Sequence, residues 1–177
     1  MSRIAVAHSP LGFGGGERVC LSVLEALQYR YDVRLITDRA IDIRKHNEYF
    51  GTDVDPGAIS VRGLPPPIPS VLEVIPYRFV RLKQSLVSRY LRRIEREYDL
   101  IISTRDEYNV FEPDVQYIHN PRLTREDLQG SRRDDRLYTV YSKLCDRLLR
   151  PPADPPATEA ILANSAWTAD VVAEVYE

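Results

Sequence analysis

The sequence predicts a doubly wound α/β domain with a parallel, Rossmann-like sheet. The chain opens with an apolar run over residues 3–8, then a glycine-rich loop and an amphipathic segment, an order typical of strand, loop and helix. Apolar runs and amphipathic segments alternate along the rest of the chain, which predicts a parallel sheet with helices on both faces. The later apolar runs are continuous, as in parallel strands that are buried on both sides.

The elements of the first half follow from local sequence. After the first strand, apolar residues at helical spacing predict a helix over residues 15–29, and the apolar run over residues 32–37 predicts a second strand. A polar loop then leads to a short third strand over residues 59–61. Residues 63–70 are rich in proline and are expected to lie outside regular structure, because proline donates no backbone hydrogen bond and fixes φ. Ser70 is expected to cap the helix that follows.

The second half continues the alternation. The expected elements are a helix over residues 77–97, strands over residues 100–103 and 115–118, a helix over residues 134–149 and a last strand over residues 160–163. Asn164 or Ser165 is expected to cap the final helix, because both residue types accept hydrogen bonds from the first free amides of a helix.

The glycine-rich loop indicates an anion site. Gly14, Gly15 and Gly16 lack Cβ atoms where a ligand can approach the first amides of the helix, which carry the positive end of the helix dipole. A nucleotide-type ligand is therefore the first hypothesis. The dinucleotide fingerprint is half met, because Glu17 stands where its third glycine should be and Asp38 stands where a ribose-binding acid would. A stand-alone nucleotide- or dinucleotide-binding domain is one alternative, and a loop that binds nothing is another.

Length and composition exclude several classes of protein. The chain has 177 residues, enough for one domain with a proper core, and is 44% hydrophobic and 28% charged, with a formal net charge of −2. This balance gives no reason to expect nucleic acid as a partner. No apolar run approaches the ~20 residues that span a bilayer, and no signal peptide precedes the first strand, so we expect a cytoplasmic protein. Cys20 and Cys145 make no disulfide framework.

Three motifs resemble elements of family-four glycosyltransferases of the GT-B fold, in that family's order and spacing. Residues 14–19, Gly-Gly-Gly-Glu-Arg-Val, resemble the element after its first strand. Residues 116–121, Gln-Tyr-Ile-His-Asn-Pro, resemble its strand that ends in a histidine on the acceptor side of the cleft. Residues 161–168, Ile-Leu-Ala-Asn-Ser-Ala-Trp-Thr, resemble the element that closes the last strand of its first domain. The last two motifs are most similar to those of mannosyltransferases that act on lipid-linked oligosaccharides.

This resemblance implies a function and a domain organisation. It implies transfer of a sugar from a nucleotide-sugar donor to an acceptor hydroxyl, such as one on a lipid-linked glycan, with retention of anomeric configuration and with neither metal nor cofactor. Residues 1–177 would be the N-terminal, acceptor-side domain, and the catalytic carboxylates and main donor contacts would belong to a C-terminal domain absent from this chain. The chain alone is then expected to be inactive. The residues that would contact donor or acceptor are Gly14, Gly15, Gly16, His8, Asn164 and Ser165.

His119 is the candidate catalytic residue. It ends a predicted buried strand, and at the carboxyl edge of a parallel sheet such strand ends face the ligand crevice. The Asn120-Pro121 turn would hold its ring out of the sheet, where the imidazole could hydrogen-bond the transferred sugar or the acceptor. The alternative is a histidine satisfied by backbone carbonyls. His8, at the end of the first strand, is a second candidate, whereas His46 lies in a charged run and is expected on the surface.

Two carboxylate patterns are interpreted as non-functional. Glu17 and Glu25 have E-x7-E spacing but fall on one predicted helix, without the residues that surround the family's pair. Asp53 and Asp55 form a D-x-D pattern beside a Pro-Gly turn and are expected to be a solvated turn. No metal site is therefore predicted.

The predicted helix over residues 77–97 is strongly basic. Its cations are Arg78, Arg81, Lys83, Arg89, Arg92, Arg93 and Arg96, against Glu95 and Glu97. A basic amphipathic helix can lie on an anionic membrane surface, which would suit a lipid-linked acceptor and a peripheral location. The alternative is a solvated helix face. For the whole chain, a further alternative is a non-catalytic interaction module built on the same fold.

Overall fold

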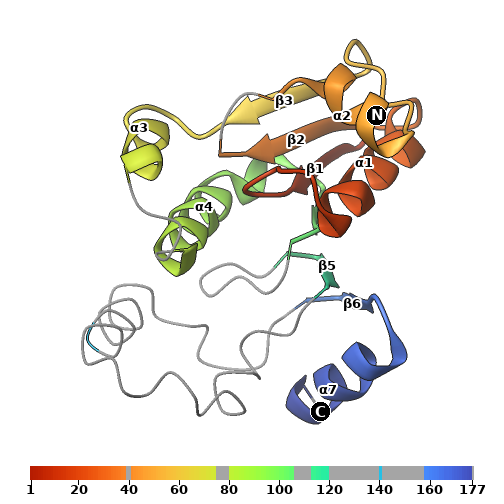
Figure 1. Ribbon diagram of the computed structural model, residues 1–177, viewed down its shortest axis with the longest axis vertical. Helices are drawn as coiled ribbons and strands as arrows, with labels where there is room; N and C mark the ends of the chain where they lie inside the picture. The colour runs from red at the N-terminus through yellow and green to blue at the C-terminus, as the bar shows by residue number, and fades with distance from the viewer. Residues whose placement is uncertain (39–40, 75–79, 106–112, 120–139, 141–157, 177) are drawn as a thin grey trace.

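Six parallel strands of the described residues form one sheet in the computed structural model (Figure 1), in the order β3-β2-β1-β4-β5-β6. The strands are β1 (Arg3–Ala7), β2 (Asp32–Thr37), β3 (Ile59–Gly63), β4 (Leu100–Ser103), β5 (Val115–Ile118) and β6 (Ala160–Ala163). The helical elements are α1 (Gly15–Leu27), α2 (Ile43–Phe50), α3 (Ile68–Val74), α4 (Val80–Ile94), the 3₁₀ turn η2 (Glu95–Glu97) and α7 (Ala166–Tyr176). The predicted doubly wound α/β fold with a parallel sheet is confirmed.

The structure describes most, but not all, of the chain. The described residues are 1–38, 41–74, 80–105, 113–119, 140 and 158–176, with only the backbone described at 71–73, 80–85, 175 and 176. The predicted helix over residues 134–149 lies outside this part of the chain except at residue 140, and so does Cys145. Residues 77–79 of the predicted basic helix and the Asn120-Pro121 turn also lie outside it.

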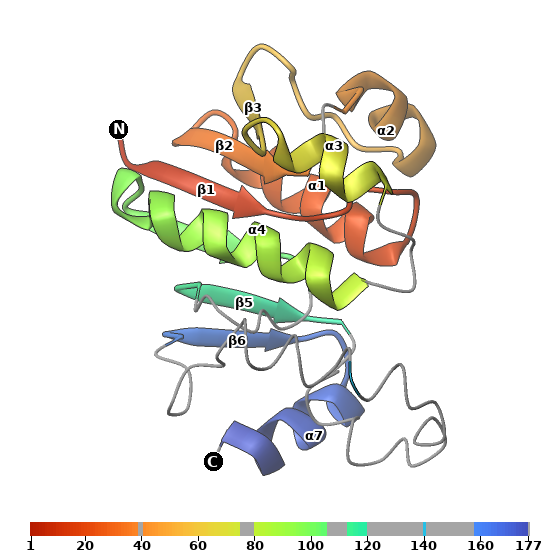
Figure 2. The same cartoon turned by 90° about the vertical axis from the view of Figure 1, so that its left-hand side faces the viewer.

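β1 separates two hydrophobic cores, because its side chains alternate between the two faces of the sheet. Ile4 and Val6 pack in a first core with Cys20, Leu21 and Leu24 of α1. The second core lies on the opposite face and consists of Ala5, Ala7, Ile36, Leu64, Val87, Leu91, Ile94 and Ile101. Since three of these residues belong to α4, α1 and α4 cover opposite faces of the sheet (Figure 2).

The strand order places a topological switch point between β1 and β4. From β1 the chain moves to one side of the sheet through β2 and β3, and it returns through α4 to pair β4 with the other side of β1. The strands run in one direction, so their carboxyl ends share an edge. Ligands of open parallel sheets bind at this edge beside the switch point, and the glycine-rich loop leaves β1 there.

The bounds of β2, β4, β5 and β6 agree with the prediction, whereas α2 was not predicted. This helix lies in the loop that the sequence analysis described only as polar. Asp42 caps its first turn by accepting a hydrogen bond from the Lys45 amide at 3.2 Å. Gly51 ends it with φ of 68°, a left-handed conformation that glycine adopts without strain. Two local signals therefore delimit the helix, although its charged sequence hid its apolar face.

Residues 63–70 are more regular than predicted. Gly63 ends β3, and α3 begins at Ile68 with Pro69 in its first turn. Proline is tolerated there because the first amides of a helix have no intrahelical partners. Ser70 lies inside α3, so the prediction that it caps the next helix is wrong.

Candidate functional site

The glycine-rich loop leads into α1 with Gly14 as the N-cap residue. Gly14 has extended backbone, with φ of −128° and ψ of −175°, and no side chain caps the helix. The first amides of α1, on Gly15 and Gly16, therefore lack a capping partner from this position. Gly15 is exposed and Gly16 is half-buried. The positive end of the α1 dipole is thus open to an anion at the carboxyl edge of the sheet.

Glu17 turns its side chain back beneath this loop. The residue is 9% exposed, and its Oε1 accepts a hydrogen bond from the Gly12 amide at 3.2 Å. The same oxygen lies 3.9 Å from His8 Nε2 and 3.9 Å from Arg105 Nη1, which follow β1 and β4. The His8 ring, together with the amides of Glu17 and Gly12, lowers the pKa of Glu17 to about 2 against the opposing effect of burial. Glu17 is therefore a buried carboxylate that stays ionised at neutral pH.

His8 is fully buried beneath the loop and is held by the end of β4. Its Nδ1 lies 3.0 Å from Thr104 Oγ1, and that hydroxyl donates to the Ala7 carbonyl at 3.4 Å. Nε2 faces the Glu17 carboxylate, 3.9 Å from its Oε1. A Cβ added at Gly16 would lie 3.5 Å from His8 Cε1, so this ring supports the loop from below.

His119 follows β5 and reaches the same loop. Its ring is exposed, and a Cβ added at Gly15 would lie 3.6 Å from its Cε1 and 3.7 Å from its Nε2. Asn164 Nδ2 lies 3.1 Å from His119 Nδ1, and the Asn164 amide is oriented by Thr168, whose Oγ1 donates to Oδ1 at 2.7 Å. Asn164 therefore donates to Nδ1 of His119. This bond leaves the proton of the neutral ring on Nε2, beside Gly15.

Ser165 affects the site indirectly, through Thr168. Its Oγ accepts a hydrogen bond from the Thr168 amide at 3.1 Å, so Ser165 caps α7, as predicted. Its Oγ also lies 3.0 Å from Thr168 Oγ1. The cap therefore fixes the hydroxyl that orients Asn164, which in turn holds His119.

The ends of four strands meet at the first turn of α1. Figure 2 shows β1, β5 and β6 running in one direction, and β4 pairs in parallel with both β1 and β5. The predicted site residues that come together here are Gly15, Gly16, His8, His119 and Asn164. Gly14 contributes differently, because a Cβ added there would lie 2.7 Å from Glu17 Oε2. Its lack of a side chain makes room for the buried carboxylate.

Sequence reasoning missed Glu17, Thr104 and Arg105. Glu17 stands three residues after the N-cap, where acidic side chains commonly turn back toward the start of a helix, and this position was the available signal. Thr104 and Arg105 follow β4 as His119 follows β5. The rule that singled out His119, that strand ends at the carboxyl edge face the ligand, applies equally to both.

His46 is 6% exposed, so the prediction that it lies on the surface is wrong. Its ring stacks on Phe13 of the glycine-rich loop, with ring centroids 4.6 Å apart and planes 10° apart. Tyr49 and Phe50 of the same helix also contact Phe13, with centroid separations of 4.8 Å and 6.2 Å. Phe13 therefore anchors the loop to α2.

The other carboxylate patterns have local roles. Glu25 is exposed on α1, so it forms no site with the buried Glu17. Asp53 and Asp55 are exposed on either side of a buried Val54, and Asp55 accepts a hydrogen bond from the Gly57 amide at 2.7 Å. They form the solvated turn that was predicted. In the described part of the chain, no three His, Cys, Asp or Glu side chains are grouped as metal ligands.

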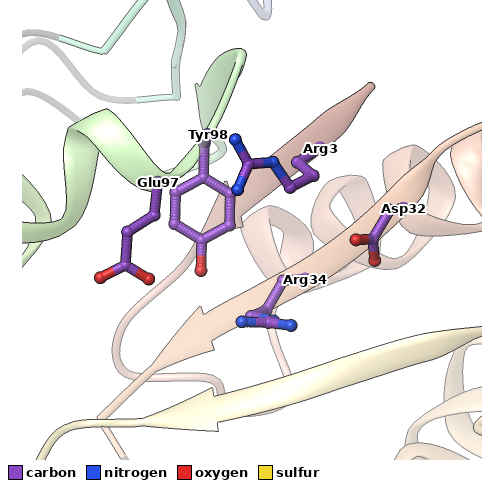
Figure 3. A pocket seen from close by; sticks show the side chains of 5 residues that line it. All are labelled: Arg3, Asp32, Arg34, Glu97 and Tyr98. Carbon is purple, nitrogen blue, oxygen red and sulfur yellow. The ribbon is translucent and has the colours of Figure 1, made fainter. Parts of the chain in front are cut away.

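A cavity of about 150 Å³ lies at the opposite edge of the sheet (Figure 3). It is lined by Arg3, Asp32, Arg34, Glu97 and Tyr98. Arg3 and Asp32 begin β1 and β2, so this is the amino edge rather than the edge where parallel sheets bind ligands. Arg62 Nη1 contacts Glu97 at 2.5 Å, so a carboxylate of the cavity wall already has a cationic partner. We therefore place the candidate site at the carboxyl edge.

The fold of this chain is similar to that of about half of a longer protein chain whose structure has been solved. UGT2 of Phytolacca americana, complexed with UDP-2fluoro-glucose and pterostilbene, is similar with a TM-score of 0.50 and 15% sequence identity, over 93% of this chain and 47% of that chain. The apo structure of UGT2 gives a TM-score of 0.47 and 15% identity, over 93% and 46%. This chain thus spans about half the length of either structure. No protein family and no curated protein matches the sequence.

None of the helices in the described residues is both long enough and apolar enough to cross a bilayer.

Proposed function

We propose that this chain is the acceptor-side half of a GT-B glycosyltransferase that transfers a sugar from a nucleotide-sugar donor to an acceptor hydroxyl, with retention of configuration and without a metal. The observation that carries the proposal is the convergence of His8, His119 and the first amides of α1 beside the switch point. The fold shared with half of UGT2, which is complexed with a UDP-sugar analogue, supports the same assignment. The motifs that resemble family four support the retaining, metal-independent class.

The chemistry of the site suits a leaving diphosphate and a neutral sugar. The amides of Gly15 and Gly16, at the positive end of α1, would stabilise negative charge that develops on the leaving group. The proton on His119 Nε2 lies beside these amides and can donate to a sugar hydroxyl. We propose that the catalytic carboxylates and the main contacts to the nucleotide belong to a second domain, so this chain binds ligand without transferring sugar.

The alternative dinucleotide-binding function depends on Asp38, and the position of this residue disfavours it. Asp38 is 7% exposed, and its Oδ1 accepts a hydrogen bond from Thr37 Oγ1 at 3.3 Å. A carboxylate that binds a ribose must present its oxygens to the ligand, whereas this one is buried at the end of β2. The nucleotide-sugar hypothesis is therefore better supported than the dinucleotide-binding hypothesis.

A titration of the ¹⁵N-labelled chain with UDP-glucose, followed by NMR, tests the proposal. We expect the amide resonances of Gly15 and Gly16 and the ring resonances of His119 to shift with increasing ligand, because these groups line the carboxyl edge. Titration with NAD is the matched control and is expected to leave them unchanged. Tight NAD binding that is lost in Asp38→Ala, or no response to UDP-glucose, would contradict the proposal.

We also propose that α4 lies against the cytoplasmic face of an anionic membrane and brings the site to a lipid-linked acceptor. Arg92 and Arg93 of α4 and Arg96 of the adjoining 3₁₀ turn η2 are exposed, whereas Val87 and Leu91 of α4 are buried in the core. The exposed face of the helix is therefore cationic, and each such residue near an anionic surface contributes about 1 kcal/mol.

Sedimentation with phosphatidylserine vesicles tests this membrane contact. We expect the chain to bind at low salt and to be released as salt rises, because screening shortens the range of the attraction. The double variant Arg92→Glu, Arg93→Glu is expected to lose binding, and vesicles of neutral lipid serve as the control. If the chain does not bind at low salt, the membrane proposal is wrong.

A further inference from the structure

The carboxylate of Glu17 ties the glycine-rich loop to the strands on both sides of the switch point. We propose that Glu17 is the positioning residue that holds this loop in its ligand-binding conformation, by joining the Gly12 amide to the side chains of His8 and Arg105. This inference rests on the proposed function for the identity of the ligand. It assigns Glu17 no contact with the ligand itself.

The geometry concentrates several contacts on one side chain. Oε1 accepts the hydrogen bond from the Gly12 amide at 3.2 Å and lies 3.9 Å from both His8 Nε2 and Arg105 Nη1. Oε2 occupies the space that a Cβ on Gly14 would need, at 2.7 Å. The two carboxylate oxygens therefore face the loop at two positions, one before the N-cap residue and one at it. Gly12 therefore cannot move away from α1 without breaking its hydrogen bond to Glu17.

The surroundings of Glu17 keep it charged. The groups that face it are His8 from the end of β1, Arg105 from the end of β4, and the thiol of Cys20 one turn along α1. The His8 ring and the amides of Glu17 and Gly12 favour the ionised carboxylate and lower its pKa to about 2. Burial first, and then the charge of Glu17, raise the pKa of Cys20 to about 12 despite its bond to Thr104, so this thiol stays neutral. The ionised Glu17 carboxylate therefore keeps its contact with the Gly12 amide throughout the physiological pH range.

An ordered loop matters because Gly12 and Gly14, which lead into the first turn of α1, offer little resistance to movement. Glycine has more backbone freedom than any other residue, and fixing its backbone therefore costs conformational entropy. A loop that is already ordered presents its amides to a ligand without meeting this cost at the moment of binding. Phe13 holds the loop against His46, and Glu17 holds it through the Gly12 amide.

The direction in which Glu17→Ala changes the affinity for UDP distinguishes a positioning role of Glu17 from an effect of its charge alone. Glu17 is negative and lies near the proposed diphosphate site, so removal of its charge alone should strengthen the binding of UDP. If Glu17 holds the loop, Glu17→Ala should instead weaken UDP binding by about tenfold, since the loop must then be ordered on binding. Glu17→Gln keeps an acceptor for the Gly12 amide and is expected to bind UDP within about threefold of the unaltered chain.

The experiment combines UDP titration by NMR with amide hydrogen exchange of Gly12 in the 177-residue chain. The chain and Glu17→Gln are expected to protect the Gly12 amide from exchange, whereas Glu17→Ala is expected to lose this protection. Glu25→Gln, on the exposed face of the same helix, is the matched control and is expected to change neither measurement. Where Glu17→Ala does not fold, Glu17→Asp replaces it, because the shorter side chain cannot reach Gly12 from the same backbone.

The outcomes separate this inference from the proposed function. Tighter UDP binding by Glu17→Ala, or unchanged protection of Gly12, would overturn the positioning role while leaving the nucleotide site intact. Absence of UDP binding by the unaltered chain would count against the proposed function, and the exchange of the Gly12 amide would still decide whether Glu17 holds the loop.

Discussion

Glu17→Gln is expected to lower the free energy of unfolding by about 3 kcal/mol at pH 6, with a difference that shrinks as the solution becomes acidic. The pKa of Glu17 falls from 4.5 to about 2 on folding, and a change of this size corresponds to about 3 kcal/mol. Because the folded-state pKa is depressed, this stability is fully present above pH 4.5 and is lost as pH falls toward 2. At pH 3 about half of it should remain.

Urea denaturation of the two proteins across this pH range measures the difference. Glu25→Gln is the control, because Glu25 is exposed on the same helix, and it should change the free energy of unfolding by less than about 0.5 kcal/mol at every pH. A difference between the chain and Glu17→Gln that stays constant from pH 6 to pH 3 would show that the lost stability does not come from the ionised carboxylate.

His119→Ala is expected to weaken the binding of UDP-glucose by about tenfold and to leave the binding of UDP within about twofold. One hydrogen bond from His119 Nε2 to the sugar accounts for a change of this size. The proton is available on Nε2 because Asn164 donates to Nδ1, and the ring stands beside Gly15, where the leaving diphosphate would lie. NMR titrations with the two ligands measure both affinities.

A second variant distinguishes the contribution of the His119 ring from that of the hydrogen bond with Asn164 that orients it. Asn164→Leu removes the donor to Nδ1 while keeping the imidazole, and it should weaken UDP-glucose binding less than His119→Ala does. Equal loss of UDP and UDP-glucose affinity in His119→Ala would mean that the ring acts on the nucleotide or on the loop, and the proposed contact with the sugar would be wrong.

The sheet could be predicted because each of its strands has a local signature. A parallel strand buried on both faces needs a continuous apolar run, and residues 100–103 and 115–118 supply such runs. The strand order could not be predicted, since it depends on which strands pair. The buried face of α2 was also hidden, because one of its members is His46, whose partner Phe13 lies in a distant loop.

The candidate site likewise has residues that local sequence indicates and contacts that depend on which strands pair. His8, His119 and the glycines could be located because each stands at a strand end or a helix start, which are features of local sequence. The contact between His119 and Asn164 depends on the pairing of β5 with β6, so no local pattern contains it. The role of Glu17 depends on Arg105, which reaches it only once β4 lies beside β1.

The long separation between His8 and Thr104 has a consequence during synthesis on the ribosome. These partners are 96 residues apart, an interval that takes roughly 5–20 s at typical translation rates. Throughout it, β1 and the start of α1 have left the ribosome while the hydroxyl that anchors His8 has yet to be made. Asn164 emerges later still. The carboxyl edge of the sheet, where Asn164 contacts His119, is therefore completed only when β6 pairs with β5.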